Sequence, residues 1–279
     1  MRVAALRPHA SRGEFQHIRW YSRALQRRTE FLLHLPSQDL KQPARNYPVL
    51  YLLHGSGHNP RSVLEQVRPQ EQLAELGAAL LVIPNGDQGW WLDSPLQRRC
   101  NYGQYALELV ALVDERYPTL ASRAGRGLCG FSMGGYGAML LASQHAEVFG
   151  AASSLLGPLD IAQMFPDYHR LRLLLGSDLE VWQRFNPTQL AARLVQTALY
   201  FCTAQEAFER PQNEAFAAAL RALGIPFEHA VHAGTHDAAW VRAHLRDAWR
   251  FHRAAFDRAF HCGYNPAARD PDAQGSAQE

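Results

Sequence analysis

A serine between two glycines is the first feature of the sequence that could do chemistry. Residues 130–134 read GFSMG, a G-x-S-x-G motif centred on Ser132. A short apolar run precedes the motif and an Ala/Leu/Met-rich stretch follows it, so the expected setting is strand, sharp turn and helix. Gly130 and Gly134 suit a turn too tight for side chains at those positions. The pattern predicts Ser132 as a nucleophile that is transiently acylated, and a packing turn with an idle serine is the alternative.

A glycine-rich loop earlier in the chain could supply hydrogen-bond donors for that reaction. Residues 51–57 read YLLHGSG, an apolar strand that breaks into a loop able to expose backbone N–H groups. Attack of a serine on a carbonyl creates an oxyanion, which two backbone N–H groups can stabilise. We expect these donors to be Met133, directly after the serine, and Ser56, with Gly55 as the alternative to Ser56. A tight turn with no catalytic duty would also explain the glycines.

A base that could activate the serine is expected among the thirteen histidines. His236 follows the last predicted strand, in a loop just before a long helical pattern, so its ring could reach over the serine. His232 is the second choice, and His244 lies too far into the helix. His54 and His58 are four residues apart, but a loop does not hold such a pair on one face, so no metal site is predicted.

A carboxylate that orients the histidine is expected between the serine and the histidine in the sequence. Residues 198–202 form a predicted strand, and Glu206 lies four residues beyond its end. We therefore predict Glu206 as the acid, with Glu209 and Asp178 as alternatives. Serine, histidine, carboxylate and two amides complete the chemistry, so no cofactor is expected.

Two adjacent tryptophans could contact a substrate. Residues 84–91 read PNGDQGWW and follow a predicted strand at the sheet edge where ligands bind in open α/β folds. We expect Trp90 and Trp91 to contact substrate, together with His54 from the neighbouring loop. Two indoles on one loop could equally cap the hydrophobic core.

The elements that must position these residues alternate along the chain. From residue 47, short apolar runs alternate with longer amphipathic segments, which indicates a mostly parallel sheet with helices on both faces. Two earlier strands would pair antiparallel at one edge. The predicted strands are 15–21, 29–35, 49–53, 79–83, 127–129, 151–155, 198–202 and 227–231, and the clearest helices are 105–116, 213–223 and 236–256.

Length and composition favour one large domain. Of the 279 residues, 47% are apolar and 19% are charged, which is enough to build a sizeable core. We assign residues 1–263 to a single domain. Residues 157–187 are polar, aromatic and interrupted by three prolines, and they could form a small cap over a binding site. Residues 264–279 lack apolar periodicity and are predicted to be disordered.

Charge and cysteine usage bear on partners and location. The net charge is +2 with no run of like charges, so no nucleic-acid partner is expected. The chain begins without an apolar signal region, and its longest apolar run, 78–84, is too short to span a membrane. Four widely spaced cysteines without a C-x-x-C pair indicate reduced thiols and a cytoplasmic protein. The oligomeric state is left open.

On these motifs the sequence resembles the esterase family that includes S-formylglutathione hydrolases, tributyrin-type and feruloyl esterases, and the mycobacterial antigen 85 mycolyltransferases. The resemblance covers roughly residues 47–256. It rests on YPVLYLLHG at 47–55, GFSMGGYGA at 130–138, and GTHD at 234–237 followed by Trp240. It implies an α/β-hydrolase fold and supports Ser132, His236 and the Met133 amide in the roles given above. The chain departs from the family after the acid strand, where residues 203–206 read TAQE in place of a glycine-containing loop ending in aspartate.

The combined interpretation is a serine carboxylic-ester hydrolase acting on a small-molecule ester or thioester. One alternative is an acyltransferase of the same mechanism, in which an alcohol replaces water. The other is a non-catalytic binding protein on a hydrolase scaffold, which the altered acid loop suggests. The acyl and alcohol parts of the substrate are not specified by the sequence.

Overall fold

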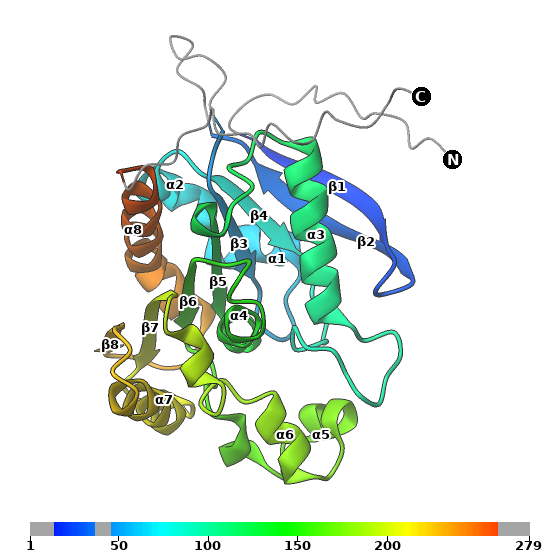
Figure 1. Ribbon diagram of the computed structural model, residues 1–279, viewed down its shortest axis with the longest axis vertical. Helices are drawn as coiled ribbons and strands as arrows, with labels where there is room; N and C mark the ends of the chain where they lie inside the picture. Colours follow the sequence, from blue (N-terminus) through cyan, green and yellow to red (C-terminus); the bar gives the residue numbers. More distant parts are fainter. Residues whose placement is uncertain (1–13, 37–45, 262–279) are drawn as a thin grey trace, which may run out of the picture.

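The computed structural model describes residues 14–36 and 46–261, which fold around one mixed sheet (Figure 1). The described strands form an eight-stranded sheet in the order β1-β2-β4-β3-β5-β6-β7-β8. The pairs β1·β2 and β2·β4 are antiparallel and the other neighbouring pairs are parallel. The strands are β1 (Phe15–Ser22), β2 (Arg27–His34), β3 (Val49–Leu53), β4 (Leu80–Pro84), β5 (Arg126–Phe131), β6 (Ala151–Leu155), β7 (Ala198–Ala204) and β8 (Glu228–His232). The predicted parallel sheet with an antiparallel N-terminal edge is confirmed.

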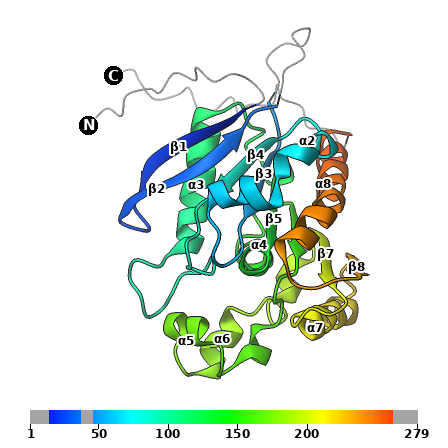
Figure 2. The same ribbon diagram turned by 180° about the vertical axis from the view of Figure 1, so that it is seen from behind.

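Helices cover both faces of the sheet, as Figures 1 and 2 show from opposite sides. They are α1 (Pro60–Ser62), α2 (Leu73–Leu76), α3 (Tyr102–Arg116), α4 (Met133–Gln144), α5 (His169–Leu175), α6 (Leu179–Arg184), α7 (Arg210–Ala222) and α8 (Ala238–His261). Apolar side chains of α3, α4 and α7 lie in one buried cluster, and those of α2 and α8 lie in another. The two clusters take alternate residues of β3, because successive side chains of a strand point to opposite faces.

Helix α8 begins two residues later than the sequence predicted. It starts at Ala238, which leaves His236 in the loop between β8 and the helix. Asp237 fixes this start, because its carboxylate accepts hydrogen bonds from the backbone N–H of Trp240 at 2.8 Å and from the Thr235 hydroxyl at 2.7 Å. These bonds lower the pKa of Asp237. The loop that carries His236 is therefore held at its helical end.

The segment proposed as a cap, residues 157–187, contains α5 and α6 and leads away from the carboxyl end of β6. Its large apolar side chains, Leu171, Leu174 and Trp182 among them, belong to the same buried cluster as α3 and α4. The segment therefore shares the core of the sheet. The predicted tail, 264–279, lies outside the described residues. Within the described ranges, no helix is long and apolar enough to cross a membrane.

Candidate active site

Ser132 lies in the sharp turn between β5 and α4. Its φ of +54° is in the left-handed region, which side-chain-bearing residues seldom adopt. A Cβ atom on Gly130 would lie 2.1 Å from the Gly134 carbonyl oxygen, and one on Gly134 would lie 2.0 Å from the Leu53 carbonyl oxygen. Only glycine fits at either position. The turn thus presents Ser132 at the positive end of α4, where negative charge is favoured.

His236 lies within hydrogen-bonding distance of the serine. Its Nε2 is 2.9 Å from the Ser132 Oγ, although the two residues are 104 positions apart in the sequence. The loop around the histidine is fixed by the Trp240 indole, which donates to the Ala233 carbonyl at 3.0 Å. The same indole packs so closely that a Cβ on Gly234 would lie 2.7 Å from it. Sequence reasoning and structure therefore bring Ser132 and His236 together.

The carboxylate on the other side of the imidazole is Glu209. Its Oε2 is 2.8 Å from His236 Nδ1, and its Oε1 accepts a hydrogen bond from the Thr203 hydroxyl at 2.9 Å. The side chain is fully buried, with 0% exposure. With Nδ1–H donated to Glu209, the Nε2 lone pair can accept the serine proton.

The prediction that Glu206 orients the histidine is wrong. Glu206 is exposed, and its hydrogen bond within the described part of the chain is made by its backbone N–H, which donates to the Gly234 carbonyl at 3.1 Å. Strand β7 continues to Ala204, two residues beyond the predicted end, so the following turn carries the Glu206 side chain outward and Glu209 reaches the imidazole. Asp178 instead caps α6 by accepting from the Glu180 N–H at 2.9 Å. The sequence did carry one signal for Glu209, because this residue stands directly before the Arg-Pro pair that begins α7.

Two backbone segments border Ser132 where an oxyanion would form. Met133 is the first residue of α4, and the N–H groups of a first helical turn lack partners within the helix. The loop after β3 passes close by, since a Cβ on Gly55 would lie 3.1 Å from the Ser132 Cβ. Ser56 is exposed, and its hydroxyl donates to the Gln88 side-chain oxygen at 2.6 Å. Met133 and Ser56, or Gly55, stay the predicted donors.

His54 ties two loops together and is not exposed for substrate. Its Nδ1 donates to the Gly55 carbonyl at 2.8 Å, and its Nε2 accepts from the Gly86 N–H at 2.8 Å. Burial lowers the pKa of His54 to about 4, so the ring is neutral near pH 7. The predicted contact between His54 and substrate is therefore wrong in this structure.

The two adjacent tryptophans are buried as well. Trp90 packs edge-on against Tyr136 and Tyr168, and Trp91 packs against α4 so closely that a Cβ on Gly137 would lie 2.5 Å from it. Their exposed fractions are 2% and 0%. Both residues have positive φ, +55° and +54°. The prediction that they contact substrate is wrong. The two tryptophans instead pack in the hydrophobic core, as the alternative prediction had it.

An aromatic side chain that sequence reasoning missed does face solvent beside the site. The Phe208 ring stacks on the His236 imidazole, with centroids 4.9 Å apart and planes inclined by 30°. The side chain is 59% exposed, which is unusual for a phenylalanine. The sequence signal that could have identified Phe208 is an aromatic residue within the polar stretch that follows β7. Phe208 offers an exposed apolar surface next to His236.

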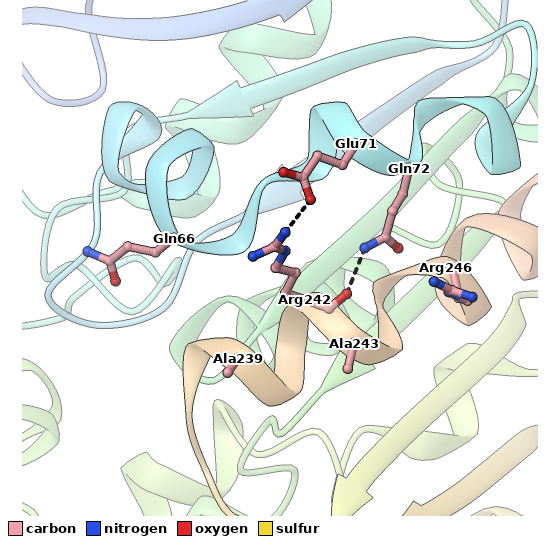
Figure 3. Close-up of a pocket in the computed structure, with 7 residues that line it drawn as sticks. All are labelled: Gln66, Glu71, Gln72, Ala239, Arg242, Ala243 and Arg246. Atoms are coloured by element: carbon pink, nitrogen blue, oxygen red, sulfur yellow. Dashed lines mark hydrogen bonds and ion pairs between the residues drawn. The ribbon is translucent and has the colours of Figure 1, made fainter.

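A separate hollow of about 470 Å³ lies between α8 and the short helical turns before α2 (Figure 3). Five of its seven lining residues are polar or charged, and the other two are alanines. The Arg242 guanidinium pairs with Glu71 at 2.5 Å, and the Arg242 backbone carbonyl accepts a hydrogen bond from the Gln72 side-chain amide at 2.7 Å. None of Ser132, His236 and Glu209 lines it. The hollow is thus distinct from the candidate active site.

Comparison with known proteins gives a consistent picture of this chain. The family model described as Putative esterase matches residues 22–252. Two curated Mycobacterium tuberculosis proteins, Esterase Rv1288 and Esterase MT1326, are each 30% identical over 131 residues, which is 46% of this chain and 29% of theirs. The chain therefore spans less than a third of the length of these curated relatives.

Solved structures show the same fold. The Staphylococcus aureus fluorophosphonate-binding serine hydrolase F superposes with a TM-score of 0.77 at 19% identity, covering 87% of this chain and 99% of that one. The S-formylglutathione hydrolase of the same organism gives 0.76 at 20%, covering 86% and 98%. Mycobacterium tuberculosis MPT51 gives 0.75 at 16%, covering 87% and 99%. These likenesses confirm the predicted α/β-hydrolase fold.

Proposed function

This chain belongs to the esterase family whose model it matches, and from that premise we propose that it is a serine esterase that hydrolyses a carboxylic ester or thioester. One observation carries the proposal. Ser132, His236 and Glu209 form a continuous hydrogen-bonded series, with distances of 2.9 and 2.8 Å, that links a serine in a strained turn to a buried carboxylate. We name these three residues the proposed triad.

The proposed reaction has two steps. Ser132 Oγ attacks the carbonyl carbon while His236 Nε2 takes its proton, and the resulting imidazolium returns that proton to the departing alcohol or thiol. A water molecule then attacks the acyl-enzyme, again giving its proton to His236, and the acid is released with Ser132 restored. Glu209 holds the imidazole with Nε2 facing the serine and stabilises the imidazolium in both steps.

Each tetrahedral intermediate carries negative charge on the former carbonyl oxygen. We propose that the Met133 N–H and an N–H of the loop after β3, that of Ser56 with Gly55 as the alternative, bind this oxygen. The positive end of α4 and the close approach of Gly55 to Ser132 support this arrangement. The mechanism draws on no metal or cofactor.

Substrate contact is proposed for Phe208 in place of the buried residues named from the sequence. Its exposed ring beside His236 suits an apolar acyl or alcohol group of a small-molecule ester. We also propose that residues 157–187 act as a small cap. Tyr168 of this segment packs on Trp90, and Arg170 donates to the Gln88 carbonyl at 2.9 Å, so the segment lies against the loop after β4.

The buried Glu209 carboxylate that is hydrogen-bonded to His236 argues against the alternative of a non-catalytic binding protein. That alternative rested on the altered loop at residues 203–206, and Glu209 supplies the acid that this loop lacks. Among the described residues of the site, no feature favours transfer to an alcohol over transfer to water. Because the family model that matches is that of esterases, hydrolysis is the reaction we propose.

Labelling with a fluorophosphonate probe tests the function directly. The wild-type protein should become covalently labelled and should hydrolyse nitrophenyl esters, and Ser132→Ala should do neither while keeping its circular dichroism spectrum. A panel of esters with increasing acyl length would then define the substrate class. Ester turnover by Ser132→Ala within a few-fold of the wild type would remove the serine from the mechanism.

We propose a cytoplasmic location as well. Cys100, Cys129 and Cys202 are buried and free, and burial raises the pKa of Cys129 and of Cys202 to about 12. Such thiols are typical of proteins kept reduced. Cell fractionation would show in which compartment the protein lies. Thiol labelling of the rapidly isolated and then denatured protein would show whether its cysteines are reduced in its native cells.

A further inference from the structure

A second group of chemically capable side chains lies where β8 meets α8. His232 ends β8, and His244 and Asp247 stand three residues apart on one side of α8. Ligand atoms of all three lie within 4.8 Å of one another, and each residue is half-buried. The proposed triad uses none of them.

The group has coordinating capacity that the described structure does not use. His232 Nε2 is buried and has no hydrogen-bond partner among the described residues. The His232 and His244 rings lie 4.0 Å apart and nearly parallel, at 16°. His244 Nδ1 is 3.9 Å from Asp247 Oδ2, which is too long for a hydrogen bond. An unpartnered buried ring nitrogen is costly, and a cation would compensate it.

We propose that His232, His244 and Asp247 bind one divalent transition-metal ion, of which Zn²⁺ is the representative. Two imidazoles and one carboxylate are a donor set that suits this class of ion and leaves a position open for water. Donors around Zn²⁺ at 2.0–2.2 Å stand about 3.4 Å apart in a tetrahedral site, so shifts of about 1 Å suffice. The nearly parallel rings must also turn about their Cβ–Cγ bonds to converge on one ion.

The position of this metal site gives it a structural role next to the catalytic loop. His232 and His244 stand on either side of the segment that contains His236, and the Trp240 ring lies 4.3 Å from the His244 ring. A bound ion would fasten the end of β8 to the second turn of α8. The ion would thus stabilise the folded loop, whereas the proposed ester hydrolysis does not draw on it.

Calorimetric titration of Zn²⁺ into untagged, chelator-treated full-length protein tests the proposal. We expect one ion per chain with micromolar affinity, and at least a tenfold loss of affinity in His244→Gln and in Asp247→Asn. His17→Gln is the matched control, because His17 also lies beside a carboxylate, Glu30, at 2.8 Å but belongs to no such group of three. Its affinity should equal that of the wild type.

Thermal unfolding provides a second readout that does not depend on activity. Zn²⁺ at about ten times the wild-type Kd should raise the Tm of the wild type and of His17→Gln equally, and should raise the Tm of Asp247→Asn clearly less. The proposal is overturned by binding weaker than about 1 mM, by undiminished affinity in both His244→Gln and Asp247→Asn, or by an equal loss in His17→Gln.

Discussion

Replacing Glu209 with glutamine keeps the shape of the side chain and removes its charge. In the structure, the two carboxylate oxygens accept from His236 Nδ1 and from the Thr203 hydroxyl. A glutamine can keep both contacts if its oxygen faces the imidazole and its amide faces the hydroxyl, which can also accept. The imidazolium that forms during the reaction then lacks its counter-charge. If the amide faces the imidazole instead, it favours the tautomer that cannot take the serine proton.

Either orientation of the glutamine lowers kcat. The comparable aspartate-to-asparagine change in serine proteases costs about 10⁴, and we expect a loss of about 10² to 10⁴ here. That corresponds to about 2.7 to 5.5 kcal/mol of lost transition-state stabilisation. The Tm should not fall substantially, because the substitution removes a buried charge and preserves the volume of the side chain.

Steady-state hydrolysis of a nitrophenyl ester measures this effect, with Glu206→Gln as the matched control. Glu206 has the same side chain three residues away but is exposed, so its kcat should stay within about twofold of the wild type. Circular dichroism and thermal melts confirm that both variants fold. The reasoning is refuted if Glu209→Gln keeps kcat within about threefold, or if Glu206→Gln loses as much.

Four further outcomes are expected. Ser132→Ala should lose nearly all turnover and keep its Tm, and residual catalysis from the backbone donors should persist; near-normal kcat would contradict this. Phe208→Ala should raise KM for aromatic and long-chain esters by several-fold and affect acetyl esters less, whereas an equal effect on all acyl lengths would argue against substrate contact. EDTA should leave ester turnover unchanged at temperatures well below the Tm, and a loss that Zn²⁺ restores in Asp247→Asn as fully as in the wild type would show that the chemistry needs a metal at another site. Burial lowers the pKa of His54 to about 4 and of His252 to about 3, below the value of about 6.5 in the unfolded chain. Between these values the unfolded state binds more protons, so stability should fall by about 2 to 3 kcal/mol per histidine from pH 7 to 4.5. Urea unfolding at the two pH values measures this, and equal stabilities would be the contrary result.

Local patterns were enough to predict most of the elements and two members of the proposed triad. The apolar runs of β3 and β4 are buried along their whole length, so their composition carried the signal directly. Ser132 could be identified because its two glycines form a local G-x-S-x-G motif in the sequence, although the contact that requires Gly134 comes from Leu53 of β3. His236 could be identified because it follows the last strand and precedes a long helix.

The acid could not be chosen from the sequence because its selection depends on the length of β7. A strand that continues two residues further changes which glutamate faces inward, and burial of Glu209 is a property of the assembled fold. The prediction for the two tryptophans failed for a different reason. Trp90 and Trp91 both adopt a left-handed backbone conformation, and both indoles lie in the core. Sequence patterns do not reveal this conformation, because residues with large side chains seldom adopt it.

The sheet order has a consequence for how the protein acquires activity during folding. The segment near Ser132 that includes Gly55 follows β3, the serine follows β5, Glu209 follows β7 and His236 follows β8. Long stretches of chain must be closed before these loops meet, and such distant pairings form slowly. Helical circular dichroism can recover while β8 is still undocked, whereas ester turnover cannot. The rate of turnover in a refolding sample should therefore be proportional to the number of chains in which the sheet is assembled through its last strand.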